Sequence, residues 1–120
     1  NIFFNTFKTL CVMPKKSKNN TPKFDITKMR KNAKEAESLL KVLANSSRLM
    51  ILCHLVNAEK SVGELVELVD LSQSSVSQHL SKMKDLKFVE DDKRGQEVFY
   101  RIDNKEVREI LLTLYNVYCK

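Results

Sequence analysis

Apolar residues recur every three or four positions along the first two thirds of the folded sequence, the spacing of helices that bury one face. One such segment covers about residues 28–43. A second, residues 46–56, follows the candidate N-cap Asn45 and is apolar nearly all round, which predicts the buried centre of the domain. A third, residues 62–69, opens with the capping-box pattern S-V-G-E. The pattern therefore predicts three successive helices before residue 70.

A fourth helix is predicted from about Gln73, with Ser72 as its N-cap, inside the stretch L-S-Q-S-S-V-S-Q-H-L-S-K-M-K of residues 71–84. At about 100° per residue its two faces differ. The apolar arc holds Val76, Leu80 and Met83, and the opposite arc holds Ser74, Gln78 and Ser81. Short hydroxyl and amide side chains suit a helix that lies in the DNA major groove, but they also suit an ordinary solvated face. For this helix in isolation both interpretations remain open.

After Leu86 the period of the pattern changes from a helical spacing to two, which is typical of strands. Strands are predicted over residues 88–92 and 97–102, with K-R-G-Q between them as a hairpin loop. A helix, a short turn and a polar-faced helix make a helix-turn-helix, and the hairpin after it would be a wing. The Lys-Arg pair at its tip is either simply solvated or reaches DNA phosphate or the minor groove.

A last helix is predicted from a capping box at residues 103–106 to about Tyr118. Its apolar stripe is broader than a small core needs, as is shown by Val107, Ile110, Leu111, Leu112, Leu114, Tyr115, Val117 and Tyr118. The first and last helices are therefore expected to form a homodimer interface. The predicted fold class is mainly α with a small β-hairpin, in the order helix, helix, helix, helix, strand, strand, helix. Residues 1–26 are expected to be a flexible basic tail and residues 27–120 the folded domain.

Composition changes this picture mainly through charge. The chain has 120 residues, 42% hydrophobic and 30% charged, and a net charge of +6, as expected for one globular domain without a membrane span. Seven Lys or Arg and one acid lie in residues 1–30, whereas residues 31–120 hold 14 of each sign. The positive charge therefore belongs to the tail, either as a solubilising arm or as an accessory arm on DNA phosphates. A cytoplasmic location without a membrane partner is expected.

The three cysteines, Cys11, Cys53 and Cys119, have neither C-x-x-C spacing nor a cluster with histidine. A disulfide-stabilised secreted domain is not indicated, and a thiol oxidoreductase lacks both the motif and a βαβ pattern. We therefore expect no enzyme activity, no catalytic residue, no cofactor and no metal site. From residue types alone, Cys53 fits a small core residue as well as a reactive thiol.

The motifs K-V-L-A-N-S-S-R-L-M-I-L, S-V-G-E-L, L-S-Q-S-S-V-S-Q-H-L-S-K-M and G-Q-E-V-F-Y-R-I together resemble the ArsR/SmtB family of bacterial winged-helix repressors, over about residues 30–119. The resemblance implies a homodimer that blocks transcription at an operator until an inducer changes its conformation. The residues expected to contact operator DNA are Ser72, Gln73, Ser74, Ser75, Ser77, Gln78, His79, Lys82, Lys93, Arg94 and Gln96.

The family's two familiar metal sites are missing from this sequence. The C-x-C cluster of the arsenic and cadmium type is replaced by L-V-E-L at residues 65–68, and the D-x-H of the zinc type by D-N-K at residues 103–105. The motifs L-C-H-L and L-Y-N-V-Y-C instead resemble the BigR/SqrR/HlyU group of dithiol sensors. That resemblance implies that reactive sulfur or an oxidant joins Cys53 and Cys119 through a disulfide or polysulfide and weakens DNA binding. Cys11 has no counterpart there. A regulator that senses a metal ion or haem, and a winged helix that binds only protein, remain alternatives.

Overall fold

The computed structural model describes residues 23–120. The expected tail lies mostly outside this range, as does Cys11, and the predicted boundary between tail and domain stays a prediction. The chain divides into two units, residues 1–34 and residues 35–120. Its elements are α2 Ile26–Leu43, α3 Ser46–Asn57, β1 Lys60–Ser61, α4 Val62–Val69, α5 Gln73–Asp85, β2 Val89–Arg94, β3 Glu97–Ile102 and α6 Lys105–Tyr118.

The helix starts are set by side chains that accept hydrogen bonds from otherwise unpaired backbone N–H groups. Asn45 caps α3 by accepting from the Arg48 N–H, as predicted. The capping box of α4 is also confirmed: the Glu64 N–H donates to Ser61 Oγ at 3.1 Å, and the Ser61 N–H donates to Glu64 Oε1 at 2.9 Å. α2 begins two residues earlier than predicted, because the Asp25 carboxylate accepts from the first N–H groups of the helix.

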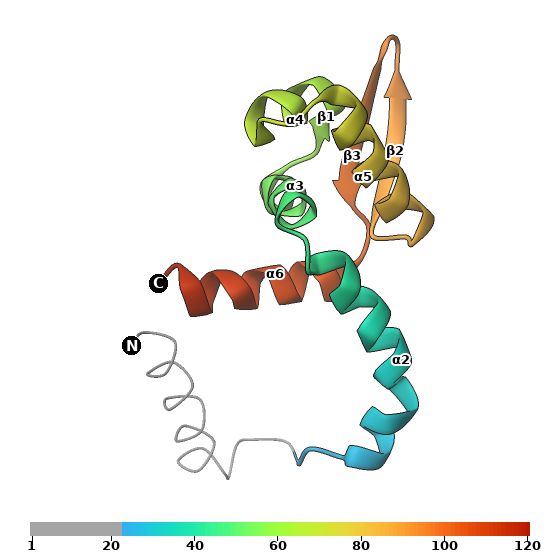
Figure 1. Cartoon of the computed structure of the whole chain (residues 1–120), viewed down its shortest axis with the longest axis vertical. Coiled ribbons are helices and arrows are strands. Elements are labelled where there is room, and N and C mark those ends of the chain that lie inside the picture. Colours follow the sequence, from blue (N-terminus) through green and yellow to red (C-terminus); the bar gives the residue numbers. More distant parts are fainter. Residues whose placement is uncertain (1–22) are drawn as a thin grey trace. The chain divides into compact units, whose positions relative to one another are not determined.

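The sheet has three antiparallel strands in the order β1-β3-β2, one more than the predicted hairpin. The sequence pattern indicated no strand before residue 88, but Lys60 and Ser61 pair with β3. Two residues are too few to show a strand period, so only pairing with β3 reveals them. β2 continues to Arg94 rather than ending at residue 92, which leaves a two-residue loop (Figure 1). Gly95 has a φ of 62° there, as a type II′ turn requires at its first position.

α6 begins after Asn104, not at a capping box that starts with Asp103. The Asp103 N–H donates to the carbonyl of Phe88 at 2.9 Å, so Asp103 still belongs to the end of the hairpin. The cap therefore moves one residue on, and the Asn104 side chain accepts from the Val107 N–H. The end of α6 at Tyr118 agrees with the prediction.

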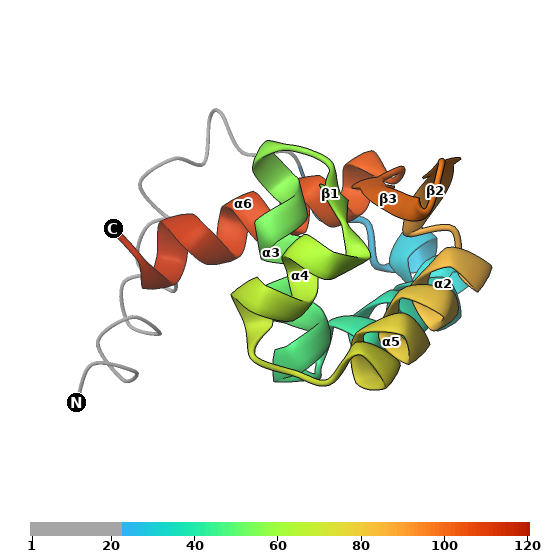
Figure 2. The ribbon, with the colours of Figure 1, turned by 90° about the horizontal axis from the view of Figure 1, so that it is seen from above.

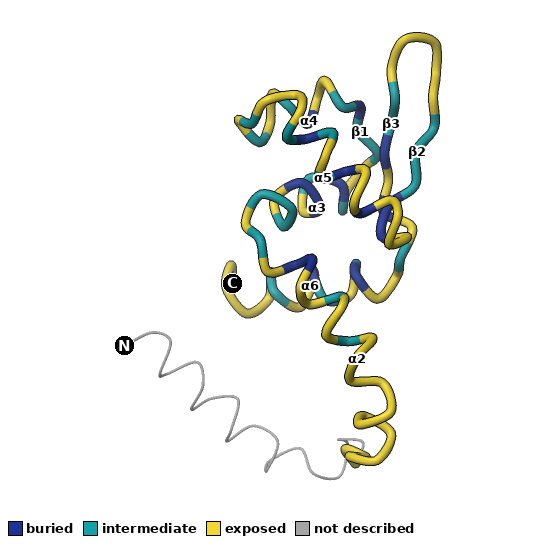
Figure 3. Tube along the Cα trace, turned by 45° about the vertical axis from the view of Figure 1, so that its right-hand side comes forward, coloured by how far each residue is buried: buried dark blue, intermediate teal, exposed yellow. Residues whose placement is uncertain are grey.

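The core lies where the inner faces of α3, α4 and α5 meet β3 and the first turns of α6 (Figures 2 and 3). Ile51, Leu52 and Leu55 make α3 its centre, as predicted, although Met50 and Cys53 on the same helix are exposed. The other buried apolar side chains are Val42, Leu43, Leu65, Val76, Leu80, Met83, Phe88, Val89, Tyr100, Ile102, Val107 and Leu111.

The second half of α6 keeps a large apolar surface exposed. Leu112 is 48% exposed, Tyr115 53% and Tyr118 70%, whereas Leu111 is buried. Tyr118 therefore belongs to the outer surface of this helix rather than to its buried side. Within residues 23–120 no single helix is long and apolar enough to cross a membrane, and only α2 with α3, as a bent pair, reaches that length and composition.

Substitutions on the two faces of α5 are predicted to change the free energy of unfolding by very different amounts. Leu80→Ala removes a fully buried side chain and should lower the free energy of unfolding by about 2–5 kcal/mol. Ser81→Ala, at the exposed neighbouring position, should change it by less than about 0.5 kcal/mol. Urea unfolding followed by circular dichroism measures both, and equal losses would contradict this orientation of the helix.

Candidate nucleic-acid interface and thiol pair

The outer face of α5 carries the side chains expected to meet DNA. Ser72, Gln73, Ser74, Gln78 and Lys82 are exposed, and Ser75, Ser77 and His79 are half-buried. The inner face is filled by fully buried apolar residues of the same helix, so the predicted separation of the two faces is confirmed. The helix thus presents a continuous row of small polar groups on a rigid base.

The serines at the start of α5 have a structural role that the sequence showed only for Ser72. Ser72 Oγ accepts from the Ser75 N–H at 3.2 Å and donates to Ser75 Oγ at 3.0 Å. It also lies 3.2 Å from Ser74 Oγ. These hydroxyls are held together at the helix N-terminus, where the helix dipole favours an anion.

A hollow of about 400 Å³ lies between the starts of α4 and α5 and the hairpin loop. Three of the expected DNA contacts line it, namely Gln73 and Ser77 from α5 and Gln96 from the loop. The fold therefore brings the polar ends of the helix and of the wing to one place, although they are distant in sequence.

Arg94, the arginine of the wing, forms ion pairs with two acidic side chains. Its terminal nitrogens donate to both carboxylate oxygens of Glu59, at 2.7 and 3.0 Å, and Arg94 Nε donates to Asp92 at 2.9 Å. The guanidinium also lies 4.6 Å from the centre of the Phe99 ring. Lys93 and Gln96 beside it are exposed. Sequence reasoning missed Glu59, because it lies 35 positions from Arg94 and only the pairing of β1 with β3 brings its segment to the hairpin.

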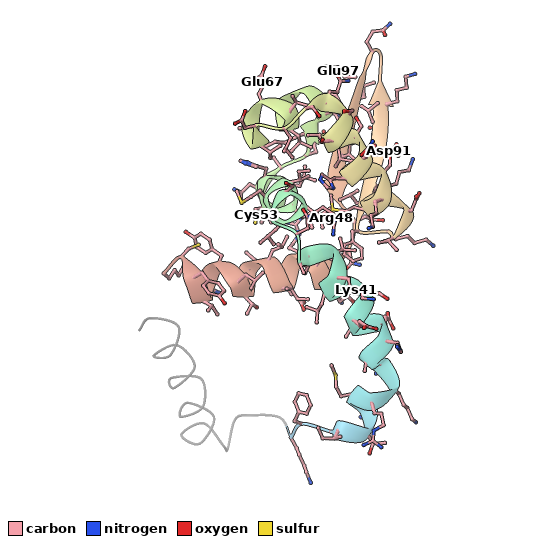
Figure 4. The ribbon with its side chains drawn as sticks, viewed as in Figure 1. Lys41, Arg48, Cys53, Glu67, Asp91 and Glu97 are labelled. Carbon is pink, nitrogen blue, oxygen red and sulfur yellow. The ribbon has the colours of Figure 1, made fainter. Side chains whose placement is uncertain are left out.

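Other acids of the wing are paired as well. Asp91, labelled in Figure 4, accepts from Lys84 of α5 at 2.9 Å, and Arg101 donates to Glu90 on the neighbouring strand. The Lys84 pair joins the end of α5 to β2. Both contacts offset the negative charge of β2, and only the Lys84–Asp91 pair links this strand to α5.

His79 lies on the side of α5 where positive charges gather. Burial, followed by the nearby charges of Arg48 and Lys82, lowers the pKa of His79. Its imidazole is therefore neutral near pH 7 in this structure. In that state it donates or accepts a hydrogen bond but adds no positive charge to the face.

Cys53 and Cys119 lie on different helices, close enough for the charge of Cys119 to act on Cys53. Cys53 lies on the outside of α3 (Figure 4), and Cys119 caps the end of α6, where its N–H donates to the Tyr115 carbonyl at 2.8 Å. Both are free and exposed, so Cys53 is not the core residue that its apolar neighbours in sequence allowed. Burial raises the pKa of the Cys53 thiol, and the charge of Cys119 raises it further. An electrostatic effect of this kind requires proximity.

A second hollow, of about 440 Å³, adjoins Cys53 between α3 and α6. Leu111 and Leu112 line it, with Tyr115 on the same helix and His54 from α3. Within residues 23–120 there is no group of three or more His, Cys, Asp or Glu side chains that could hold a metal ion. Cys53 is thus the one of the two described thiols that lines this hollow.

A helix-turn-helix with a polar second helix, followed by a β-hairpin, defines the class of winged-helix DNA-binding proteins. The family model described as "Bacterial regulatory protein, arsR family" matches residues 45–91, which run from the N-cap of α3 into β2. The relatives agree with it over most of the chain. The chain belongs to the ArsR family of transcriptional regulators, as its sequence motifs predicted.

Two named regulators illustrate the likeness. The transcriptional activator HlyU of Vibrio cholerae is 42% identical over 96 residues, which are 80% of this chain and 89% of HlyU. The structure of the transcriptional repressor BigR of Xylella fastidiosa has a TM-score of 0.77 at 33% identity and covers 81% of this chain and 99% of BigR. Both are transcriptional regulators rather than enzymes.

A third structure bears on assembly. A winged helix-turn-helix DNA-binding domain from Mycobacterium bovis, described as homodimeric, has a TM-score of 0.65 at 28% identity. It covers 73% of this chain and 83% of its own length.

The raised pKa of Cys53 predicts slow alkylation at neutral pH, because the thiolate is the reacting form. The rate at Cys53, followed by mass spectrometry of its peptide with iodoacetamide, should rise with pH and have its midpoint above that of the urea-unfolded chain. Cys119→Ser should move this midpoint down without abolishing the shift, because burial is the larger cause. A midpoint at or below that of the unfolded chain would contradict the site described here.

Proposed function

We propose that the protein is a cytoplasmic, homodimeric repressor that reads operator DNA with α5 and the wing and leaves it when Cys53 and Cys119 are oxidised. The observation that carries the DNA-reading part is the division of α5 into a fully buried apolar face and an exposed face of hydroxyl and amide groups. A helix that is fixed from behind and polar in front suits the major groove. The DNA-contact set remains the one expected from the sequence, with Lys82, Lys93 and Arg94 serving phosphates.

The proposal of a homodimer is supported by the exposed apolar surface of α6. Tyr115, Val117 and Tyr118 expose apolar area that a second copy of the chain would cover, and the Mycobacterium bovis domain is described as homodimeric. Two α5 helices related by a twofold axis would then read paired half-sites about one helical turn apart.

Repression is proposed from the likeness to BigR, which is named a transcriptional repressor. HlyU, by contrast, is named a transcriptional activator. A bound dimer acts as a repressor where its operator overlaps a promoter. The position of the operator decides the sign of regulation, and the fold suits both.

The proposed switch is a thiol oxidation that needs no metal ion. With a hydroperoxide, Cys119 is oxidised to a sulfenic acid while the peroxide is reduced to an alcohol, and Cys53 then displaces water to form the disulfide. With a persulfide RS–SH, Cys119 takes the outer sulfur and RSH leaves; Cys53 then displaces H₂S. We place the first step at Cys119 because the raised pKa of Cys53 lowers the fraction of that thiol present as the reactive thiolate at neutral pH.

A bridge between these cysteines would act through the helices that carry them. Cys53 lies on α3, which packs against α4 of the helix-turn-helix, and Cys119 ends α6, which holds the proposed dimer surface. A covalent link would therefore fix α6 to α3 and change the spacing of the two α5 helices in the dimer.

Two substitutions test whether α5 reads DNA. Gln78→Ala and Ser77→Ala should each weaken operator binding by about 5- to 150-fold, the effect of losing 1–3 kcal/mol of base discrimination. Thermal stability should stay nearly unchanged, because Gln78 is exposed and Ser77 half-buried. The operator, obtained by footprinting upstream of the protein's own gene, is used in fluorescence anisotropy.

A scrambled duplex is the control, since its affinity depends on phosphates and should not change. A parallel loss of melting temperature would instead mean that the face is structural. Affinity that does not fall steeply with salt would favour the alternative of a winged helix that binds only protein.

The thiol switch is tested on the reduced protein bound to operator. A persulfide donor should produce a Cys53–Cys119 link, detected by mass spectrometry, and should raise the operator Kd by at least tenfold. Cys53→Ser and Cys119→Ser should bind the operator normally and keep it after treatment. Release that is unchanged in Cys53→Ser would overturn the dithiol mechanism while leaving DNA binding intact.

A further inference from the structure

Glu59 binds Arg94, the arginine at the tip of the wing, through both oxygens of its carboxylate. It lies between the end of α3 and β1, and its side chain is 34% exposed. Its two oxygens accept from the two terminal nitrogens of Arg94, which lies at the end of β2. Glu59 is thus a fixed carboxylate at the place where the wing is proposed to meet DNA.

The geometry of this pair matches that of an arginine on a phosphate. Guanidinium binds carboxylate and phosphate alike through two parallel N–H groups. Glu59 fills that edge of Arg94, whereas Asp92 holds Nε and Phe99 lies against the flat face. A DNA phosphate can therefore bind Arg94 bidentately only after Glu59 leaves, and Asp92 and Phe99 can keep the side chain in position meanwhile.

Glu59 has a second cation beside it. Arg101 Nη1 lies 3.7 Å from Glu59 Oε2, and Arg101 is itself held on β3 by its pair with Glu90. When Arg94 moves to a phosphate, the Glu59 carboxylate still has a positive charge next to it. The pKa of Glu59 is lowered, chiefly by the hydrogen bonds from Arg94, so the carboxylate is ionised near pH 7.

We propose that Glu59 is an intramolecular competitor of DNA for Arg94, which holds the wing arginine in the free protein and exchanges it for a phosphate when the operator binds. The exchange lowers the affinity for any DNA by the strength of the Glu59–Arg94 pair. It also orders Arg94 before binding, which reduces non-specific contacts made by the wing alone. An acid in the segment after α3 thereby sets the affinity of the DNA-binding surface without touching DNA.

The inference rests on the proposed contact of the wing with DNA, and one set of variants separates the two. Operator Kd and its dependence on salt are measured by fluorescence anisotropy for the full chain, Glu59→Gln, Arg94→Ala and the double variant. Glu67→Gln is the control for the loss of one negative charge, because Glu67 is exposed on α4 and points away from the hairpin (Figure 4). Thermal melting verifies that each variant is folded.

Arg94→Ala should weaken operator binding, because one phosphate is no longer neutralised by the wing. The slope of log K against log salt should then fall in magnitude by about 0.9. Glu59→Gln should tighten binding by about two- to fivefold, the effect of an exposed ion pair. The double variant should match Arg94→Ala, and Glu67→Gln should match the unmodified protein.

The other outcomes separate the two failures. If Arg94→Ala changes neither the Kd nor the slope, the wing does not contact DNA through Arg94. The proposed competition by Glu59 is then overturned as well. If Arg94→Ala weakens binding but Glu59→Gln leaves it unchanged or weakens it, Glu59 braces the wing and the competition is overturned. Equal tightening by Glu59→Gln and Glu67→Gln, or tightening by Glu59→Gln that persists without Arg94, would reduce the effect to general charge and also overturn it.

Discussion

The packing of α3 is the constraint on which the rest of residues 35–120 depends. Ile51, Leu52 and Leu55 are almost completely buried, and α3 packs against α4, β3 and α6. Burying three large aliphatic side chains contributes roughly 1.5–3 kcal/mol each. The position of the helix-turn-helix, the sheet and α6 is therefore set by one helix, and a displacement of that helix reaches all three.

In the proposed mechanism, one short helix connects the thiol side of the protein with its DNA-binding side. The inner side of α3 supports α4 and, through it, α5. Its outer side carries Cys53, next to the hollow bounded by α6, and its end leads into Glu59 and the wing. The proposed thiol chemistry and the ion pairing at the wing would then act on the same rigid element. Such an element transmits a change because a packed core shifts between discrete arrangements rather than deforming continuously.

The sequence predicted the elements that local chemistry determines and missed those that depend on distant pairing. Caps at Asn45, Ser61 and Ser72 place helix starts to the residue, because each cap bonds within its own turn. β1 was missed because its two residues are a strand only beside β3. The faces of α5 followed from periodicity, but the hold of Glu59 on Arg94 did not, since that pair spans 35 positions. The expected roles of the DNA-contacting residues and of the two thiols remain proposals.

The attraction of the protein to DNA depends on individual ion pairs rather than on the net charge of the folded residues. Residues 31–120 carry equal numbers of acidic and basic side chains, so attraction to DNA cannot come from an overall positive folded unit. The three acids of β2 are bound to Lys84, Arg94 and Arg101, whereas Lys82 and Lys93 stand exposed on the proposed DNA-binding side. The local arrangement of charges then determines the attraction to DNA more than the net charge does. The reason is that interactions between exposed charges more than about 10 Å apart are screened at 0.1 M salt. Affinity in such a protein depends on which partner each arginine holds, and an acid distant in sequence can therefore control it.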